Sequence, residues 1–263
     1  MNKKTITNHE IKEIIKERYA KVINTRSCCG TGNTTKSAFK EDYSNIDGYV
    51  ATADYNLGCG LPTEYAAIEH GNHVLDLGCG AGNDVFIARS IVGKSGKVVG
   101  LDMTEDMLKK AEQNKTQLGY NNIDFILGEI EEIPLDQNQF DVVVSNCVLN
   151  LVPDKNKAYQ EVYRVLKPTG HFCMSDVVLS NPLPDKLTNR PELYASCVSG
   201  ALLKEDYLNV IKNAGFENIE IVKERPIILS DEKLKEVLSE EELISFRSQP
   251  SPVLSITIKA TKQ

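Results

Sequence analysis

The sequence contains no apolar run long enough to cross a bilayer, and its first residues lack the apolar core of a signal peptide. Lysine and arginine are scattered instead of forming a stripe, and the formal net charge is −7. These absences argue against a membrane protein, an exported protein and a protein that binds nucleic acid. We therefore expect a cytoplasmic protein whose partners are small molecules, with no membrane and no nucleic acid among them.

Metal-ligand spacing is missing as well. The chain has seven cysteines and four histidines, yet no Cys-x-x-Cys pair occurs, and the neighbouring His70 and His73 have no cysteine at ligand spacing. In a reducing cytosol, an odd number of cysteines favours ligands, redox thiols or small buried residues over structural disulfides. A preformed zinc site is not indicated, and soft-metal chemistry would have to assemble from thiols that are distant in the sequence.

A glycine-rich stretch organises the chain. The apolar residues 74–77 are typical of a buried parallel strand, and Gly78, Gly80 and Gly82 follow before a helical pattern begins at Asp84. Glycines at alternate positions let the backbone turn sharply and bring its N–H groups close to a ligand. A strand, a glycine turn and a helix in this order predict a nucleotide-type crevice.

The spacing of this turn argues against a dinucleotide. The Gly-x-Gly-x-x-Gly fingerprint requires a glycine where the chain has Asn83. Asp102 closes a second apolar run, 97–101, where a strand-end carboxylate accepts hydrogen bonds from two ribose hydroxyls. Together with Asp-Leu-Gly-Cys-Gly-Ala-Gly at 76–82, this aspartate resembles the signature of class I S-adenosylmethionine (SAM) methyltransferases. The less specific alternative is a tight turn in an unrelated α/β protein.

The resemblance implies SAM as the cofactor and suggests its contacts. After the third predicted strand, Glu129 or Ile130 would contact the adenine, although a solvated acidic turn is the alternative. After the fourth, Asn146 would lie near the methionine part of SAM. The expected cofactor-binding residues are Asp76, Gly78, Cys79, Gly80, Gly82, Asp102, Met103, Glu129, Ile130 and Asn146.

Strand and helix patterns alternate from residue 71 onward. Strands are predicted at 73–77, 97–101, 123–127, 140–145 and 171–178, and helices at about 84–91, 105–117, 155–166 and 204–213. Two further alternating segments, 217–223 and 253–260, have the pattern of strands near an edge, the last of them antiparallel. The order specifies an α/β fold with a doubly wound, mostly parallel, seven-stranded, Rossmann-like sheet of the class I SAM-methyltransferase kind.

Three segments divide the chain. Residues 1–70 form an N-terminal extension with an amphipathic helix at 10–23, a loop with Cys28 and Cys29, and a second loop with Cys59. Residues 71–180 form the Rossmann-like core that binds SAM. Residues 181–263 hold a substrate-site insertion after strand five, with Cys197, and the closing strands. Glycines lie beside the Cys28–Cys29 pair and on both sides of Cys59, and they predict that both loops are mobile. Pro62 begins a short helix, which places Cys59 at the mouth of the crevice.

The other cysteines fall into two groups. Cys79 lies inside the glycine turn and Cys173 inside a predicted strand, and both have the profile of small buried residues. Cys59, Cys147 and Cys197 fall on loops or at element ends that could flank one crevice. Three convergent thiolates suit a thiophilic trivalent ion far better than magnesium or calcium. No histidine stands at the strand ends, where a hydroxyl acceptor would require a general base, although a carboxylate could serve.

Four cysteine-containing segments in combination resemble the arsenite SAM-methyltransferases. They are Ser-Cys-Cys-Gly at 27–30, Leu-Gly-Cys-Gly-Leu-Pro at 57–62, Ser-Asn-Cys-Val-Leu-Asn at 145–150 and Tyr-Ala-Ser-Cys-Val-Ser-Gly-Ala at 194–201. The match covers about residues 19–216. Leu57 departs from it, because some members have an aromatic residue there that packs on SAM.

This resemblance implies an arsenic-detoxifying enzyme. Arsenite or its thiol conjugates, or methylarsenite, would be held by the thiolates of Cys59, Cys147 and Cys197, and the lone pair of As(III) would take the SAM methyl group in line. Cys28 and Cys29 would help to return arsenic to As(III), with a thiol reductant such as glutathione or thioredoxin as partner.

Two other classes remain open. A generic class I methyltransferase acting on a quinone or another small carbon or oxygen acceptor would share the SAM residues and owe nothing to the three cysteines. A thiol sensor or metalloid-sequestering protein would bind As(III) without consuming SAM. Arsenite-dependent turnover of SAM distinguishes the three hypotheses.

Overall fold

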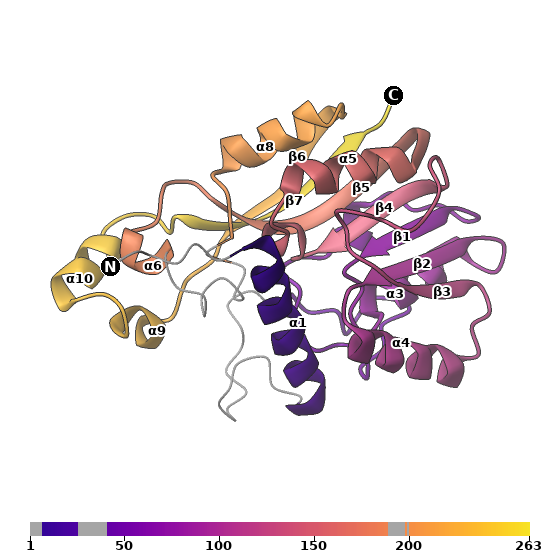
Figure 1. Ribbon diagram of the computed structural model, residues 1–263, viewed down its shortest axis with the longest axis horizontal. Helices are drawn as coiled ribbons and strands as arrows, with labels where there is room; N and C mark the ends of the chain where they lie inside the picture. The colour runs from indigo at the N-terminus through magenta and orange to yellow at the C-terminus, as the bar shows by residue number, and fades with distance from the viewer. Residues whose placement is uncertain (1–6, 26–40, 189–197, 199) are drawn as a thin grey trace.

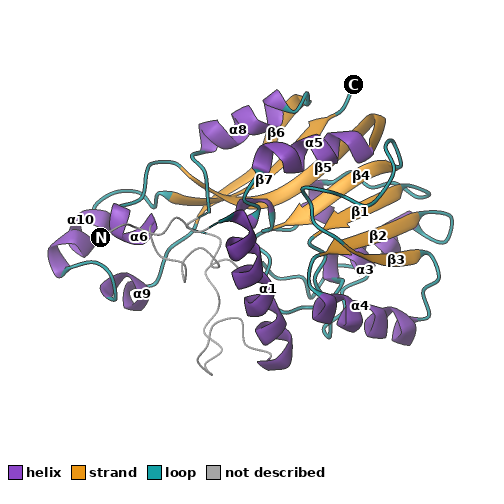
Figure 2. Ribbon diagram, in the orientation of Figure 1, coloured by secondary structure: helices purple, strands orange, loops and turns teal. Residues whose placement is uncertain are grey.

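The computed structural model describes residues 7–25, 41–188, 198 and 200–263 of the 263-residue chain. A seven-stranded sheet in the order β3-β2-β1-β4-β5-β7-β6 lies at its centre, with helices on both faces (Figures 1 and 2). The strands are β1 (His73–Leu77), β2 (Lys97–Asp102), β3 (Ile123–Leu127), β4 (Phe140–Asn146), β5 (Leu166–Leu179), β6 (Glu217–Pro226) and β7 (Val253–Thr261).

The described helices vary widely in length. They are α1 (Asn8–Thr25), α2 (Pro62–Tyr65), α3 (Asn83–Val92), α4 (Glu105–Leu118), α5 (Lys155–Val165), α6 (Asp185–Thr188), α8 (Lys204–Asn213), α9 (Asp231–Lys235), α10 (Glu240–Arg247) and the 3-10 turn η1 (Leu149–Leu151). Within the described ranges, none of them combines the length and the apolar character that crossing a membrane requires.

The sheet is doubly wound around β1. Strands β1 to β5 pair in parallel, with β2 on one side of β1 and β4 on the other, and β7 runs antiparallel to both β5 and β6. Loops that leave the carboxyl ends of β1 and β4 therefore diverge in opposite directions, and a crevice opens between them at this switch point. The predicted seven-stranded, mostly parallel sheet and its antiparallel last strand are confirmed.

The core explains why the central strands are continuous apolar runs. Val74, Leu75 and Leu77 of β1 are fully buried, because helices cover the sheet on both faces. On one face the strands pack with α5 and α8, and on the other face with α3. Cys173 of β5 is buried in the second of these clusters, as predicted from the sequence.

Two regions differ from the predicted pattern. Strand β5 begins at Leu166, five residues before the predicted strand at 171, because Leu166 already pairs with Phe140 of β4 across an irregular register. Helices α9 and α10 lie between β6 and β7 and were not predicted. Both are too short for a clear helical period, and they project with α6 beyond the end of the sheet (Figure 1).

Candidate active site

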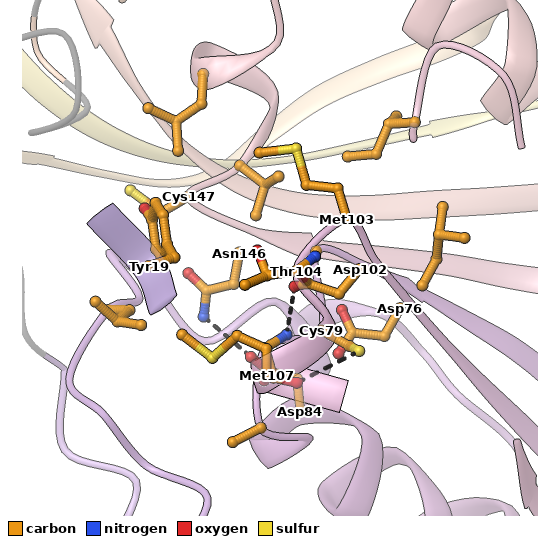
Figure 3. Close-up of a pocket in the computed structure, with 18 of the residues that line it drawn as sticks. Tyr19, Asp76, Cys79, Asp84, Asp102, Met103, Thr104, Met107, Asn146 and Cys147 are labelled. Carbon is orange, nitrogen blue, oxygen red and sulfur yellow. Dashed lines mark hydrogen bonds between the residues drawn. The ribbon is translucent and has the colours of Figure 1, made fainter. Parts of the chain in front are cut away.

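A pocket lies at the carboxyl ends of β1, β2 and β4, and helix α1 forms one of its walls (Figure 3). The loops after these strands supply most of the lining, and α1 adds Lys12, Ile15 and Tyr19. Of the predicted cofactor residues, all except Gly82 line this pocket. The ends of three separate strands thus meet where the topology predicts a ligand.

The glycine turn brings the backbone against the pocket. Gly78 and Gly80 have φ values of 68° and 53°, a region that residues with a side chain rarely adopt. A Cβ atom on Gly78 would lie 2.5 Å from a methyl carbon of Val148, whereas one on Gly80 would meet only the Met107 sulfur, at 3.8 Å. Gly78 therefore permits close packing of two loops, and Gly80 leaves open space for a ligand.

Gly82 has a structural role beside the pocket. It is the N-cap of α3, with a φ of 96°, and a Cβ atom there would lie 2.9 Å from the Phe86 ring. The residue allows the strand to turn directly into the helix. It thus shapes the loop that lines the pocket without contributing to the lining itself.

Asp102 is held at the end of β2 by two backbone donors. One carboxylate oxygen accepts from the Gly80 N–H at 2.9 Å, and the other accepts from the Thr104 N–H at 2.8 Å. Burial raises the pKa of this carboxyl, although hydrogen bonds from these donors oppose the rise. The carboxylate joins the glycine turn to the start of α4, and each oxygen keeps capacity for a further donor.

Two acceptors in the pocket wall lack a partner within the described residues. They are Asp76 Oδ2 and Asn83 Oδ1, both of which are buried. Burial raises the pKa of Asp76 well above its usual range, and the charges of Asp84 and Asp102 raise it further. Because a buried acceptor without a partner costs about 1–3 kcal/mol, these atoms favour a ligand that carries donors.

The Asn146 side chain joins β4 to the loop that contains Cys59. Its Oδ1 accepts from the N–H groups of Cys59 and Gly60, at 3.0 and 3.3 Å, and its Nδ2 donates to the Gly60 carbonyl at 2.9 Å. The Nδ2 also donates to Asp84 Oδ2 at 3.2 Å and to the Tyr43 hydroxyl. Burial raises the pKa of Asp84 to about 6, and the hydrogen bonds from Asn146 and Tyr43 limit the rise.

Cys59 and Cys147 belong to one apolar cluster, which also contains Leu151 and Val177. Cys147 is 3% exposed and lines the pocket directly after Asn146, with a φ of 63°. Cys59 is fully buried, next to the pocket residue Gly58, instead of lying at the mouth of the crevice. Tyr19 of α1 packs against the same cluster and lies at the Cys147 end of the pocket in Figure 3.

The backbone of Cys59 is fixed, in contrast to the mobile loop that its glycine neighbours predict. Its N–H donates to Asn146, and its carbonyl accepts from the Ser255 hydroxyl at 2.7 Å and from Arg225 at 3.2 Å. Glycines therefore serve another purpose here. A Cβ atom on Gly58 would lie 2.7 Å from Asn146 Nδ2, so this residue lets the loop approach the asparagine closely.

Cys28, Cys29 and Cys197 lie outside the described residues. Val198, which follows Cys197, is described and belongs to the same apolar cluster as Cys59 and Cys147. Within the part of the chain that the structure describes, no group of three or more His, Cys, Asp or Glu side chains could hold a metal ion. The third thiol of the predicted set falls outside that part.

The other two described cysteines, Cys79 and Cys173, belong to a different apolar cluster from Cys59 and Cys147. Burial and the charges of Asp102 and Asp76 raise the pKa of Cys79 well above its usual range, and burial raises the pKa of Cys173 to about 12. Both thiols therefore stay protonated. Their expected role as small buried residues is confirmed, and Cys79 also lines the pocket.

Several site residues were missed in the sequence. Lys12, Tyr19 and Tyr43 come from the N-terminal extension, and only tertiary packing brings them to the ends of the core strands. Asp84 was visible as the first acidic residue of α3, but its bonds to Tyr43 and Asn146 were not. Thr104 and Met107 follow Asp102 at the start of α4, and their position after a strand end was the available signal.

Comparison with known proteins gives the family. Residues 68–215 match the family model described as a methyltransferase domain. The arsenite methyltransferase of Halobacterium salinarum is 38% identical, over 81% of this chain and 59% of its own length, and that of Aquipseudomonas alcaligenes is 35% identical, over 89% of this chain and 70% of its own. This chain thus spans between about half and three quarters of the length of these relatives.

A solved structure agrees with these matches. The crystal structure of an arsenic(III) S-adenosylmethionine methyltransferase from Chlamydomonas reinhardtii is 37% identical, with a TM-score of 0.67, over 78% of this chain and 67% of that one. The sheet topology, the pocket at its switch point and these similarities agree with the resemblance inferred from the cysteine segments. The chain belongs to the arsenite methyltransferase family, whose members are SAM-dependent class I methyltransferases.

Proposed function

We propose that this protein methylates trivalent arsenic, with SAM as the methyl donor. The observation that carries the proposal is one thiol at the wall of the SAM-type pocket with a second thiol buried in the apolar cluster beside it. Cys147 lines the pocket, Cys59 is buried in the same apolar cluster, and the residue after Cys197 packs in that cluster too. This arrangement supports a three-thiol site for arsenic at one end of the pocket.

The pocket fits SAM by its donor and acceptor pattern. The Asp102 carboxylate would accept from the ribose hydroxyls, and the unpartnered Asp76 Oδ2 and Asn83 Oδ1 would accept from the ammonium group. Glu129 or Ile130 would lie beside the adenine, and Asn146 near the methionine part. SAM, when bound, supplies an electrophilic methyl group on a sulfonium sulfur.

An apolar cluster suits a three-thiolate arsenic complex because that complex carries no net charge. As(III) has three positive charges, and three thiolates cancel them. Burial of an unpaired charge is costly, and apolar surroundings keep thiols protonated until a metalloid displaces the protons. We therefore expect arsenite binding at Cys59, Cys147 and Cys197 to be favourable in this cluster, with each thiol proton leaving as water together with one hydroxyl group of As(OH)₃.

The transfer itself needs no general base. As(III) bound by three thiolates keeps a lone pair and loses no proton when an arsenic–carbon bond forms. The role of the protein is therefore positioning: it aims the lone pair in line with the transferred methyl group and excludes water. This agrees with the lack of a histidine at the strand ends, where an oxygen acceptor would require a base.

Methylation leaves arsenic formally as As(V), so a further cycle requires two electrons. We propose that Cys28 and Cys29 supply them, forming a disulfide that an external thiol such as glutathione or thioredoxin reduces again. This part of the proposal rests on the sequence, because both residues lie outside the described part of the chain.

The experiment that tests the function compares acceptors. The full chain is incubated with SAM and an external thiol, and S-adenosylhomocysteine is measured with arsenite, with a demethylated quinone, or with neither. We expect product to form with arsenite alone. Turnover with the quinone and none with arsenite would favour the generic methyltransferase, and arsenite binding without turnover would favour a sequestering protein.

A further inference from the structure

We propose that Asn146 is a positioning residue for the arsenic site, and that its carboxamide sets the place of Cys59 relative to Cys147. The inference rests on the proposed function, because it assigns a purpose to the geometry of the same two thiols. It also goes beyond the expected contact between Asn146 and SAM. The residue would serve both halves of the pocket at once.

The hydrogen bonds of Asn146 are directed at the backbone around Cys59. Its Oδ1 accepts from the N–H of Cys59 at 3.0 Å and of Gly60 at 3.3 Å, and its Nδ2 donates to the Gly60 carbonyl at 2.9 Å. One carboxamide therefore pairs with donors and with an acceptor of the same short loop. An aspartate could offer acceptors alone at neutral pH, so the amide is chemically specific here.

Two further groups hold the amide in this orientation. The Nδ2 donates to Asp84 Oδ2 at 3.2 Å and also to the Tyr43 hydroxyl. If the amide were flipped, its oxygen would face the Gly60 carbonyl and the Asp84 carboxylate, and its NH₂ would face two N–H donors. The four partners thus leave a single favourable orientation.

Cys147 is fixed by the same part of the sheet. Its N–H donates to the Ser175 carbonyl of β5 at 2.7 Å, and its left-handed φ of 63° directs the chain out of β4 immediately after Asn146. The Cys59 loop approaches Ser175 as well, because a Cβ atom on Gly60 would lie 2.3 Å from the Ser175 hydroxyl oxygen. Both cysteine backbones therefore converge on Ser175, and Asn146 joins them.

The consequence concerns preorganisation. A small ion that must bond several sulfur atoms together binds more tightly when the thiols are already held near each other, because less freedom is lost on binding. Ser255 of β7 and Arg225 of β6 also form hydrogen bonds with the Cys59 backbone. Asn146 connects the Cys59 backbone to the end of β4, directly before Cys147.

The test uses the full chain without SAM, so that a loss of SAM contacts cannot affect the result. Asn146→Ala is compared with Asn122→Ala, a matched control whose carboxamide also bonds the backbone of one loop, at the Gly93 and Gly96 carbonyls, outside the pocket lining. The first measurement is the rate at which a thiol reagent labels Cys59 under native conditions, with the buried Cys173 as internal reference. The second is arsenite affinity, followed by arsenic–thiolate absorption in the near ultraviolet.

In Asn146→Ala, we expect the thiol reagent to label Cys59 about tenfold faster than in the unmodified protein. We also expect the variant to bind arsenite about tenfold more weakly, consistent with the loss of one or two hydrogen bonds. Labelling of Cys173 should not change, and Asn122→Ala should behave like the unmodified protein in both measurements. Where the alanine variant does not fold, Asn146→Asp replaces it. That variant loses the Nδ2 donor and places a carboxylate against Asp84 and the Gly60 carbonyl, so it should move both readouts in the same direction.

Unchanged labelling of Cys59 in the variant would overturn the inference, and so would faster labelling with unchanged arsenite affinity. The two proposals fail separately in this design. Lack of arsenite binding by the unmodified protein would contradict the proposed function, and the labelling rates would still decide whether Asn146 fixes Cys59.

Discussion

At the scale of single residues, the burial of carboxyl groups raises their pKa and costs stability. Asp176 of β5 is 1% exposed, and burial raises its pKa to about 7 although the Val177 N–H, Lys155 and the Tyr207 hydroxyl stabilise the charged form. The Tyr207 hydroxyl donates to it at 3.1 Å and itself accepts from Tyr159. The backbone of Asn150, in η1, also forms a hydrogen bond with Asp176. This 3-10 turn connects Cys147 to the pocket residues that follow it.

The raised pKa predicts the pH dependence of stability. Between about pH 4, the unfolded value of an aspartate, and pH 7, folded Asp176 holds a proton that the unfolded chain has lost. Its contribution to the free energy of unfolding therefore falls as the pH rises through this window, by at most about 1.4 kcal/mol per pH unit. The raised pKa of Asp84 likewise makes its contribution to the free energy of unfolding fall as the pH rises. Urea unfolding of Asp176→Asn from pH 4 to 8 should show a flatter profile than the unmodified protein.

Asp141 provides a matched control, because the pKa of its carboxyl is shifted in the opposite direction from that of Asp176. At Asp141, burial is outweighed by hydrogen bonds from His73 and Lys167, and the pKa is lowered. Its stabilising effect is present above its unfolded pKa and disappears as the pH falls through the folded value. Asp141→Asn should therefore leave the slope between pH 4 and 7 unchanged. Parallel profiles for Asp176→Asn and the unmodified protein would show that Asp176 is ionised in the folded state.

At the scale of elements, helix α1 is one of the parts of the N-terminal extension that line the pocket. Its apolar stripe was visible in the sequence, and Ile15 is buried as that stripe predicts. Lys12 holds the helix to the turn after β3, where its Nζ lies 2.7 Å from Glu129 and also pairs with Glu131. The hydrogen bond from Lys12 lowers the pKa of Glu129, which stays ionised.

Substitution of Lys12 should therefore weaken the pocket. In Lys12→Met, Glu129 and Glu131 each lose the lysine ammonium as a partner, and α1 loses an ion pair that is only 17% exposed on the lysine side. We expect SAM affinity, measured by calorimetry, to fall about five- to thirtyfold, consistent with 1–2 kcal/mol for a partly buried charged hydrogen bond. Lys16→Met on the same helix is the control, because Lys16 lies 3.9 Å from Glu129 and should change affinity less than twofold. Equal affinities for the two variants would remove Lys12 from the site.

Elements also differ in how far the sequence predicts them. The central strands and α3, α4, α5 and α8 were predictable because buried strands are continuous apolar runs and long helices show a clear period. The positions of residues at strand ends, such as Asp102 and Asn146, followed from the topology rule for parallel sheets. Contacts of Tyr43 and Lys12, and the burial of Cys59, depend on how the extension packs onto the sheet. No local pattern encodes that packing.

At the scale of the whole molecule, the predicted arsenic site joins parts of the chain that are distant in sequence. Cys59 comes from the extension, Cys147 from the end of β4, and the Cys59 carbonyl is held by Ser255 of β7 and Arg225 of β6. In the proposed site, the core sheet would supply most of the SAM contacts and Cys147, the extension would supply Cys59, and the closing strands would hold the Cys59 backbone. This arrangement would explain how a common methyltransferase fold accommodates a soft metalloid.

Cys147 is the described thiol that lines the pocket, so its substitution tests the proposed arsenic site most directly. The measurement is arsenite-dependent formation of S-adenosylhomocysteine by Cys147→Ser, by Cys173→Ser and by the unmodified chain. Cys147 lines the pocket, whereas Cys173 is buried in the core cluster that contains α3. We expect Cys147→Ser to bind SAM normally and lose arsenite-dependent turnover, and Cys173→Ser to retain it. Full arsenite-dependent turnover by Cys147→Ser would contradict the three-thiolate site.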